Sequence, residues 1–209
     1  MKIIDISMSL APDSIIYPGD TPFSTERIKD LDSGELCNLS RLEMSSHSGT
    51  HLDAPSHFIR EGKTIDEMPL DIYYGPVRII DFGAKEKISA LDLKPHLGAG
   101  LKRIICKTRG WELIKKGDFN QNHPVFTADA AEFLVQNQIQ LVGLDFITVE
   151  RGEGENYPVH TTLLSNGIAI LEGLYLEDVK PGDYILAAFP LKIAKGDGSP
   201  CRAVLIDQG

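Results

Sequence analysis

The sequence lacks the features that mark membrane-spanning, secreted or disulfide-stabilised proteins. No apolar run approaches the ~18 residues that cross a bilayer, and the start, M-K-I-I-D-I-S, is not a charged head followed by a long apolar segment. The three cysteines, Cys37, Cys106 and Cys201, are widely separated and form no C-x-x-C pair, so we expect reduced thiols. These features predict a soluble, cytoplasmic protein.

Positive charge and nucleotide-binding motifs are also scarce. The chain has 30 acidic and 21 basic residues and a formal net charge of −9, which argues against a surface for nucleic acid or anionic membranes. It contains no G-x-x-x-x-G-K-[ST] or G-x-G-x-x-G loop, no G-x-S-x-G elbow and no H-E-x-x-H helix. A small molecule is therefore the expected partner, and neither nucleotide-driven chemistry nor serine hydrolysis is favoured.

The pattern of apolar residues predicts an α/β fold. With 209 residues and 42% apolar composition the chain can bury a full core, and we expect one domain spanning residues 1–209. We predict strands at 2–7, 38–46, 76–83, 102–108, 141–145, 168–171, 184–189 and 203–206, and helices at 89–95, 127–138 and 157–166. Strands and helices that alternate in this way are typical of α/β domains. The turn-rich segment 10–22 is predicted to be a structured loop.

The segment Ser46–His57, S-H-S-G-T-H-L-D-A-P-S-H, carries three of the six histidines. Four of its side chains share one face of an extended chain, because their numbers have the same parity: His47, His51, Asp53 and His57. Gly49 and Pro55 make a continuous helix costly, by roughly 1 and 3 kcal/mol. In a straight strand His47 and His51 would lie about 13 Å apart. We therefore expect Gly49 to bend the chain and bring the two rings together.

Two imidazoles and a carboxylate are ligands that suit a divalent transition metal. Zn²⁺ is the default, Mn²⁺ and Fe²⁺ are alternatives, and three protein ligands would leave a position open for water. His160 and Glu172 lie beside apolar residues, and we interpret them as ligands of a second ion that Asp53 bridges. The alternative is a polar loop whose histidines bond to the backbone, with His160 and Glu172 structural. His96 and His123, which flank prolines, are predicted to be surface residues.

The run H-S-G-T-H-L-D-A-P-S-H-F resembles the H-x-G-T-H-x-D-x-P-x-H signature of the metal-dependent cyclase family, which includes bacterial kynurenine formamidase and isatin hydrolase. The segments Y-P-G-D-T-P-F, G-K-T-I-D-E-M-P-L, H-T-T-L-L-S-N-G-I-A-I-L-E-G-L and F-P-L-K-I-A-K-G-D-G-S-P-C-R-A-V-L also resemble the family, in the family's order. The resemblance implies a compact α/β fold of the swivelling β/β/α type and a homodimer. It implies two divalent ions in each subunit, which we expect to be zinc: His47, His51 and Asp53 hold one, and Asp53, His160 and Glu172 hold the other.

The resemblance also implies that His57 is the catalytic proton donor and acceptor of an amide hydrolase. The implied reaction converts N-formylkynurenine to kynurenine and formate. Hydrolysis of isatin or another cyclic amide or lactone is the alternative, and a non-catalytic metal-binding protein is a second one. Tyr17 stands where kynurenine formamidases typically have tryptophan before P-G-D, so we predict that it forms a wall of an aryl pocket; it could instead pack the loop or support a dimer contact. The stretch 143–150 reads G-L-D-F-I-T-V-E, where the family commonly has T-P-S-V-D after G-[IL]-D.

Overall fold

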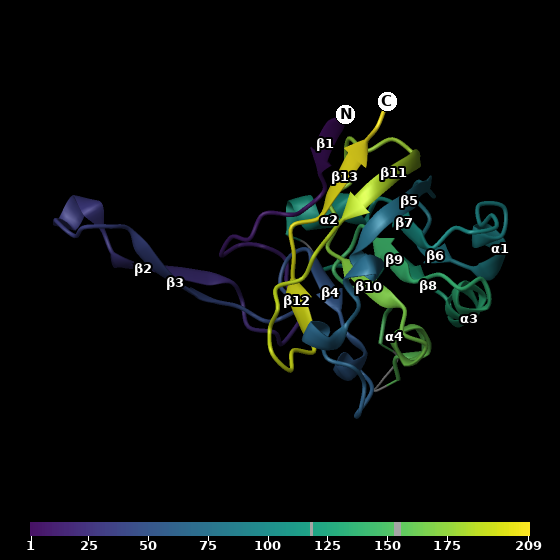
Figure 1. Cartoon of the computed structure of the whole chain (residues 1–209), viewed down its shortest axis with the longest axis horizontal. Helices are drawn as coiled ribbons and strands as arrows, with labels where there is room; N and C mark the ends of the chain where they lie inside the picture. The colour runs from purple at the N-terminus through teal and green to yellow at the C-terminus, as the bar shows by residue number, and fades with distance from the viewer. Residues whose placement is uncertain (118, 153–155) are drawn as a thin grey trace.

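The computed structural model describes residues 1–117, 119–152 and 156–209. Within these residues the strands of the main sheet are β1 (Lys2–Asp5), β4 (His51–Asp53), β5 (Tyr74–Asp81), β7 (Arg103–Lys107), β9 (Leu141–Leu144), β10 (Ala169–Glu172), β11 (Gly182–Ala187), β12 (Gly198–Pro200) and β13 (Val204–Asp207). Their order across the sheet is β1-β13-β11-β5-β7-β9-β10-β4-β12 (Figure 1). The pairs β5–β7, β7–β9 and β9–β10 are parallel, and the outer pairs are antiparallel.

The central strands are buried on both faces, which is why their sequences are nearly continuous apolar runs. In β7 the side chains of Ile104 and Cys106 pack in one core cluster, whereas Ile105 between them packs in the other. The first cluster includes apolar residues from the helices α1 (Ala90–Leu93), α2 (Gly110–Lys116), α3 (Ala128–Gln136) and α4 (Pro158–Ser165). The helices thus cover one face of the sheet, and loops and outer strands cover the other.

The predicted α/β class and most of the predicted elements are confirmed. The predicted helix 89–95 is α1, where the Asp92 carboxylate accepts from the Ser89 backbone N at 2.9 Å and closes a capping box. Thr127 precedes α3 as its N-cap. Helix α2 was not predicted, although Gly117 at its end has the positive φ of 65° that commonly terminates a helix. No helix within the described ranges is long and apolar enough to cross a bilayer.

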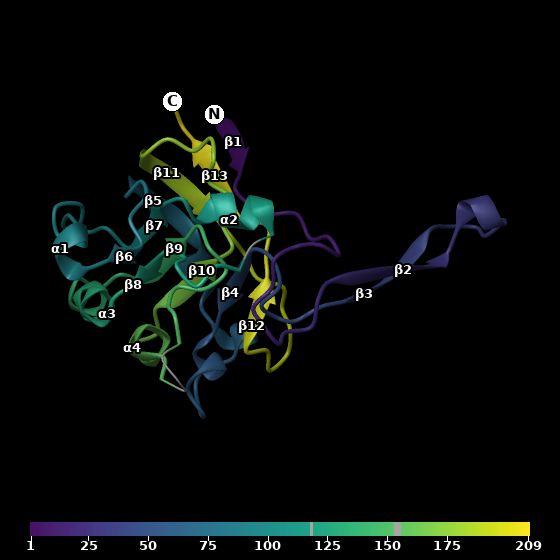
Figure 2. The same cartoon turned by 180° about the vertical axis from the view of Figure 1, so that it is seen from behind.

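The strand predicted at 38–46 does not belong to the main sheet. Its residues form β3 (Leu39–Glu43), which pairs with β2 (Ser24–Lys29) in a hairpin that projects from the body (Figures 1 and 2). Every residue of both strands is exposed. Alternating residues look the same in a hairpin and in a core strand, so local sequence could not place this segment. A short parallel pair, β6 (Lys87–Ile88) and β8 (Val125–Phe126), lies near α1 and α3.

The prediction that His123 lies on the surface is wrong. Only 2% of this residue is exposed, and its ring stacks on Phe146 with centroids 4.4 Å apart. Its Nδ1 lies 3.1 Å from the Pro124 carbonyl oxygen. Burial lowers the pKa of His123 to about 4, so the ring is neutral near pH 7. His96 is partly exposed.

The buried carboxyl group of Asp145, after β9, is expected to make stability depend on pH. It accepts from the Thr108 backbone N at 2.7 Å and from Thr108 Oγ1 at 2.5 Å. Burial raises the pKa of Asp145 from 3.8 to about 7, although the bonds from Thr108 act in the other direction. The folded protein therefore binds this proton more tightly than the unfolded chain, so this contribution to stability is lost as pH rises through about 7.

Asp145→Asn should remove that part of the pH dependence, since the amide does not ionise. Melting temperatures of both proteins, measured at several pH values from about 4 to 8, test this. Because the histidines titrate in both proteins alike, the difference between the two curves isolates Asp145. Parallel curves would assign the pH dependence to other groups.

Candidate metal centre

The backbone bends where the histidine segment enters β4. Gly49 has a φ of 68°, and the ring centroids of His47 and His51 lie 5.1 Å apart, which confirms the predicted bend. Gly173, directly after β10, packs against this bend: a Cβ on it would lie 2.2 Å from the Gly49 carbonyl oxygen. Thr50 Oγ1 donates to the Gly173 carbonyl at 2.5 Å. The two glycines thus allow the loop before β4 and the end of β10 to meet closely.

Antiparallel pairing of β4 with β10 brings distant ligand candidates together. His51 is directly opposite Glu172, and their Nε2 and Oε2 atoms lie 3.0 Å apart. Asp53, two residues after His51, has the same orientation in the strand, and its Oδ1 lies 3.4 Å from His51 Nε2. His47 Nδ1 reaches the same Asp53 oxygen at 2.9 Å. The strand register therefore assembles two imidazoles and two carboxylates.

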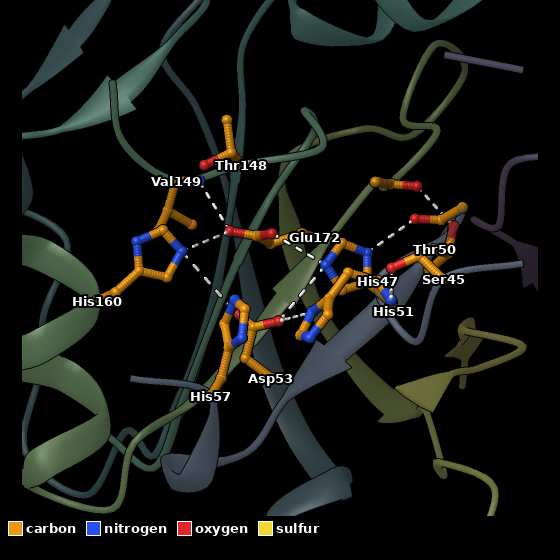
Figure 3. A network of polar contacts seen from close by, with 12 residues as sticks. Ser45, His47, Thr50, His51, Asp53, His57, Thr148, Val149, His160 and Glu172 are labelled. Carbon is orange, nitrogen blue, oxygen red and sulfur yellow. Dashed lines mark hydrogen bonds and ion pairs between the residues drawn. The ribbon is translucent and has the colours of Figure 1, made fainter. Parts of the chain in front are cut away.

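His160 joins this cluster from the first turn of α4 (Figure 3). Its Nε2 lies 3.4 Å from Glu172 Oε1 and 3.7 Å from Asp53 Oδ2. His57 follows β4 in a 3₁₀ turn, and its ring stacks on His47 with centroids 3.9 Å apart. The structure thus brings together all six side chains predicted for the metal centre and its proton donor. Their roles as ligands and as donor stay predictions.

The buried carboxylates favour positive charge between the rings. Burial alone would lower the pKa of His51, but Asp53 and Glu172 raise it to about 10. Burial opposes protonation of His160 too, and Glu150 and Glu172 raise its pKa to about 10. These rings carry protons near neutral pH, and a divalent cation supplies the same positive charge. Metal binding at such a site is expected to release protons.

An unsatisfied oxygen supports the fit of a divalent ion. Asp53 Oδ2 is buried and has no hydrogen-bond partner among the described residues, a costly arrangement for a carboxylate. Among the described residues, two sets of three side chains each place their donor atoms within 4.8 Å of one another. His51, Asp53 and Glu172 form one set, and His47, Asp53 and His57 form the other. Imidazole nitrogens and carboxylate oxygens match the donors that zinc and related ions take. The second set includes His57, which the family resemblance makes a proton donor and not a ligand.

Glu150 is a functional candidate that the sequence reasoning did not identify. Its buried carboxylate accepts from the backbone N of Val159 at 3.0 Å, the backbone N of His160 at 2.8 Å and His160 Nδ1 at 2.6 Å. These bonds cap α4 and direct Nε2 of His160 toward the cluster. The sequence did contain a signal for Glu150, because this residue stands where the family commonly has the aspartate of T-P-S-V-D.

Asp197 was also not identified. Its Oδ2 lies 3.0 Å from His47 Nε2 and 3.8 Å from His57 Nδ1, and its Oδ1 accepts from Ser46 Oγ at 3.1 Å. Burial lowers the pKa of His47, but bonds to Asp197 and Asp53 outweigh it and raise the pKa to about 9. The turn K-G-D-G around Asp197 was the available signal. Asp197 thus orients both His47 and the ring stacked on it.

A cavity of about 250 Å³ opens beside the cluster. Beyond the cluster's own residues, it is lined by Tyr17, Asp20, Phe58, Ile147, Thr148 and Tyr157. The hydroxyl oxygen of Tyr17 lies 3.3 Å from that of Tyr157, and its ring meets Phe119 edge to face at 5.4 Å. Tyr17 therefore lies in a cavity wall while it also packs the loop.

The chain is similar to known hydrolases both in sequence and in structure. A family model described as "Putative cyclase" matches residues 4–151. Kynurenine formamidase from Bacillus thuringiensis (strain Al Hakam) is 39% identical over 202 residues, which cover 97% of this chain and 96% of the relative. A solved "potential metal-dependent hydrolase with cyclase activity" is 31% identical with a TM-score of 0.85, covering 100% of this chain and 98% of that one. Isatin hydrolase A from Labrenzia aggregata bound to benzyl benzoate is 27% identical with a TM-score of 0.84. The match covers 98% of this chain and 93% of that one.

The fold and the buried cluster together define a metal-dependent hydrolase. The chain belongs to the cyclase family, because the family model matches well over half of its length and the similarity to a relative extends over nearly all of it. The family resemblance drawn from the histidine segment is confirmed. A divalent metal is the cofactor that these relatives and the donor atoms support, and the donor set by itself does not select its identity or number.

Proposed function

We propose that the protein hydrolyses the aryl formamide N-formylkynurenine to kynurenine and formate. The observation that supports this most directly is that the four histidines of the cluster and Glu172 line a cavity whose lining also includes three aromatic side chains. The curated relative named kynurenine formamidase, similar over nearly the full length, supports the same reaction. A small amide is then the partner of the cavity.

The metal would be held by the cluster: His47, His51, Asp53, His160 and Glu172. When bound, such an ion polarises a carbonyl oxygen and lowers the pKa of water to about 7. Glu150 holds a proton on His160 Nδ1 and so keeps Nε2 available to the ion. Asp53 is central in the cluster, because it belongs to both sets of donor atoms.

His57 is suited to move the proton that amide hydrolysis requires. Burial lowers the pKa of His57, so its ring is neutral near pH 7 and can accept a proton. Asp197 Oδ2 lies 3.8 Å from Nδ1, too far for a hydrogen bond but close enough for its negative charge to stabilise the protonated ring. The ring would take a proton from water and return it to the departing aryl amine as the C–N bond breaks. Phe58 and Ile147 add apolar surface to the cavity lining.

Assays of the purified protein test this proposal. Metal-loaded and metal-stripped samples are each incubated with N-formylkynurenine or isatin, and the product of each reaction is measured. We expect hydrolysis of the formamide by the loaded sample alone. Isatin hydrolysis is the second candidate, supported by the structural similarity to isatin hydrolase A. If the protein preferred isatin, isatin would replace N-formylkynurenine as the proposed substrate. A metal-binding role without catalysis would hold if neither compound were cleaved.

The finer cofactor and assembly assignments belong to the same proposal. We propose two zinc ions per subunit, one held by His47, His51 and Asp53 and the other by Asp53, His160 and Glu172, with manganese or iron as alternatives. We also propose that the protein is a homodimer in the cytoplasm. The projecting β2–β3 hairpin, whose exposed apolar residues include Leu36 and Leu42, supports the dimer. Elemental analysis and light scattering of the purified protein test these points.

Tyr17→Ala is expected to weaken binding of aryl substrates more than of small aliphatic formamides. The reason is that an aromatic pair contributes about 0.5–1.5 kcal/mol beyond area burial, so KM for an aryl formamide should rise by up to about tenfold. Steady-state kinetics with both substrate types measure this. Equal losses on both, with a lower melting temperature, would show that Tyr17 mainly packs the loop against Phe119 and Tyr157.

A further inference from the structure

The loop that carries Tyr17 also places a carboxylate at the cavity. The backbone N of Asp20 donates to the Tyr17 carbonyl at 3.0 Å, which closes a four-residue turn. Pro18 occupies the second position and Gly19, with a φ of 99°, the third, as a type II turn requires. The first and last residues of such a turn have Cα atoms less than about 7 Å apart. The turn therefore holds an aromatic ring and a carboxylate side by side in the cavity wall.

Asp20 is the one charged side chain that lines the cavity, among the described residues, outside the predicted metal cluster. No lysine or arginine in the described part of the chain lines it. The Asp20 side chain is half-buried, and Ser45 Oγ, at the long distance of 3.5 Å from Oδ2, is its side-chain hydrogen-bond partner within those residues. No lysine or arginine of the described lining therefore pairs with the Asp20 carboxylate.

We propose that Asp20 binds the ammonium group of an aryl formamide that also carries an amine, and so selects amino-acid substrates over neutral ones. This assignment rests on the proposed function. N-formylkynurenine has both groups, an aryl ring and an ammonium joined by a short ketone-containing chain, and one turn offers a partner to each. Its α-carboxylate would face solvent, because the described lining offers no lysine or arginine to pair with it. Isatin has no ammonium group, and its hydrolysis creates a carboxylate that Asp20 would repel.

The test compares Asp20→Asn with the wild-type protein on two matched substrates. N-formylkynurenine carries the ammonium group, whereas ortho-formamidoacetophenone has the same aryl formamide and ketone without the amino acid. Loss of the ion pair should raise KM for N-formylkynurenine about tenfold, equivalent to ~1.4 kcal/mol, with kcat unchanged. KM for ortho-formamidoacetophenone should stay unchanged. Asp13→Asn, in the exposed Pro12-Asp13 turn away from this cavity, is the control and should behave like wild type.

The outcomes separate this proposal from the proposed function. Equal changes in KM for both substrates, or no change for either, would overturn the ammonium site while hydrolysis of the formamides continued. A fall in kcat without a change in KM would also overturn it and make Asp20 a support of the loop. If the wild-type protein cleaved neither formamide, the proposed function would fail. Equilibrium binding of kynurenine and ortho-aminoacetophenone would then decide: weaker binding of kynurenine alone in Asp20→Asn supports the site, and unchanged binding of both overturns it.

Discussion

Removal of Asp53 or His51 is expected to abolish metal retention, whereas His57→Ala should keep the metal and lose most activity. Asp53 lies at the centre of the cluster, with Oδ1 at 2.9 Å from His47 and 3.4 Å from His51. Its loss removes a donor from both sets of candidate ligands. His57 is the most exposed of the cluster's histidines, and a positioned acid or base typically contributes about 10²–10⁴-fold to rate. We therefore expect kcat of His57→Ala to fall by at least about a hundredfold.

Elemental analysis after dialysis measures the metal content of each variant, and steady-state kinetics measure kcat. Asp53→Asn accompanies the alanine variant because it keeps the side-chain volume while it removes the charge. His96→Ala is the matched control, since this histidine lies against Phe82 and outside the cluster. If His57→Ala lost as much metal as Asp53→Ala, His57 would be a ligand with His47 and Asp53, and the protein would need another proton donor.

The second large effect is expected from Glu150→Ala, which should both destabilise the protein and weaken metal binding. The substitution leaves three N–H groups without their acceptor, those of Val159, of the His160 backbone and of the His160 ring. A buried unsatisfied group costs about 1–3 kcal/mol, so the free energy of unfolding should fall by at least ~2 kcal/mol. Loss of a carboxylate behind a metal-bound histidine typically weakens metal binding by about 10–100-fold.

Denaturant unfolding of the metal-stripped protein and zinc titration of the same sample separate the two effects. Glu150→Asp is informative because relatives commonly have aspartate at this place, and a partial recovery of affinity would support a positioning role. Glu132→Gln, an exposed acid in α3, is the control. A loss of stability with unchanged zinc affinity would limit Glu150 to capping α4.

The sequence by itself determined the local part of the site. His47, His51, Asp53 and His57 lie within one short segment, where the alternation of an extended chain and the freedom of glycine at Gly49 fix which side chains face one way. The structure has the bend at Gly49 and brings the two rings together, as predicted. Buried strands such as β7 and β9 were also predicted, because a short run of apolar residues can be recognised in the local sequence.

Tertiary structure alone decided which distant side chains meet. Glu172 lies opposite His51 because β4 pairs with β10 in one register, and no local pattern specifies that pairing. For His160 the residues alone left a structural role open, and the family resemblance was needed to favour the metal site. Glu150 and Asp197 emerged only when the packed elements placed them within bonding distance of His160 and His47. The same limit explains His123: its flanking proline predicted a surface loop, yet packing against Phe146 buries it. Periodicity is a short-range property of the chain, whereas strand register and burial follow from the packing of the whole sheet and its helices.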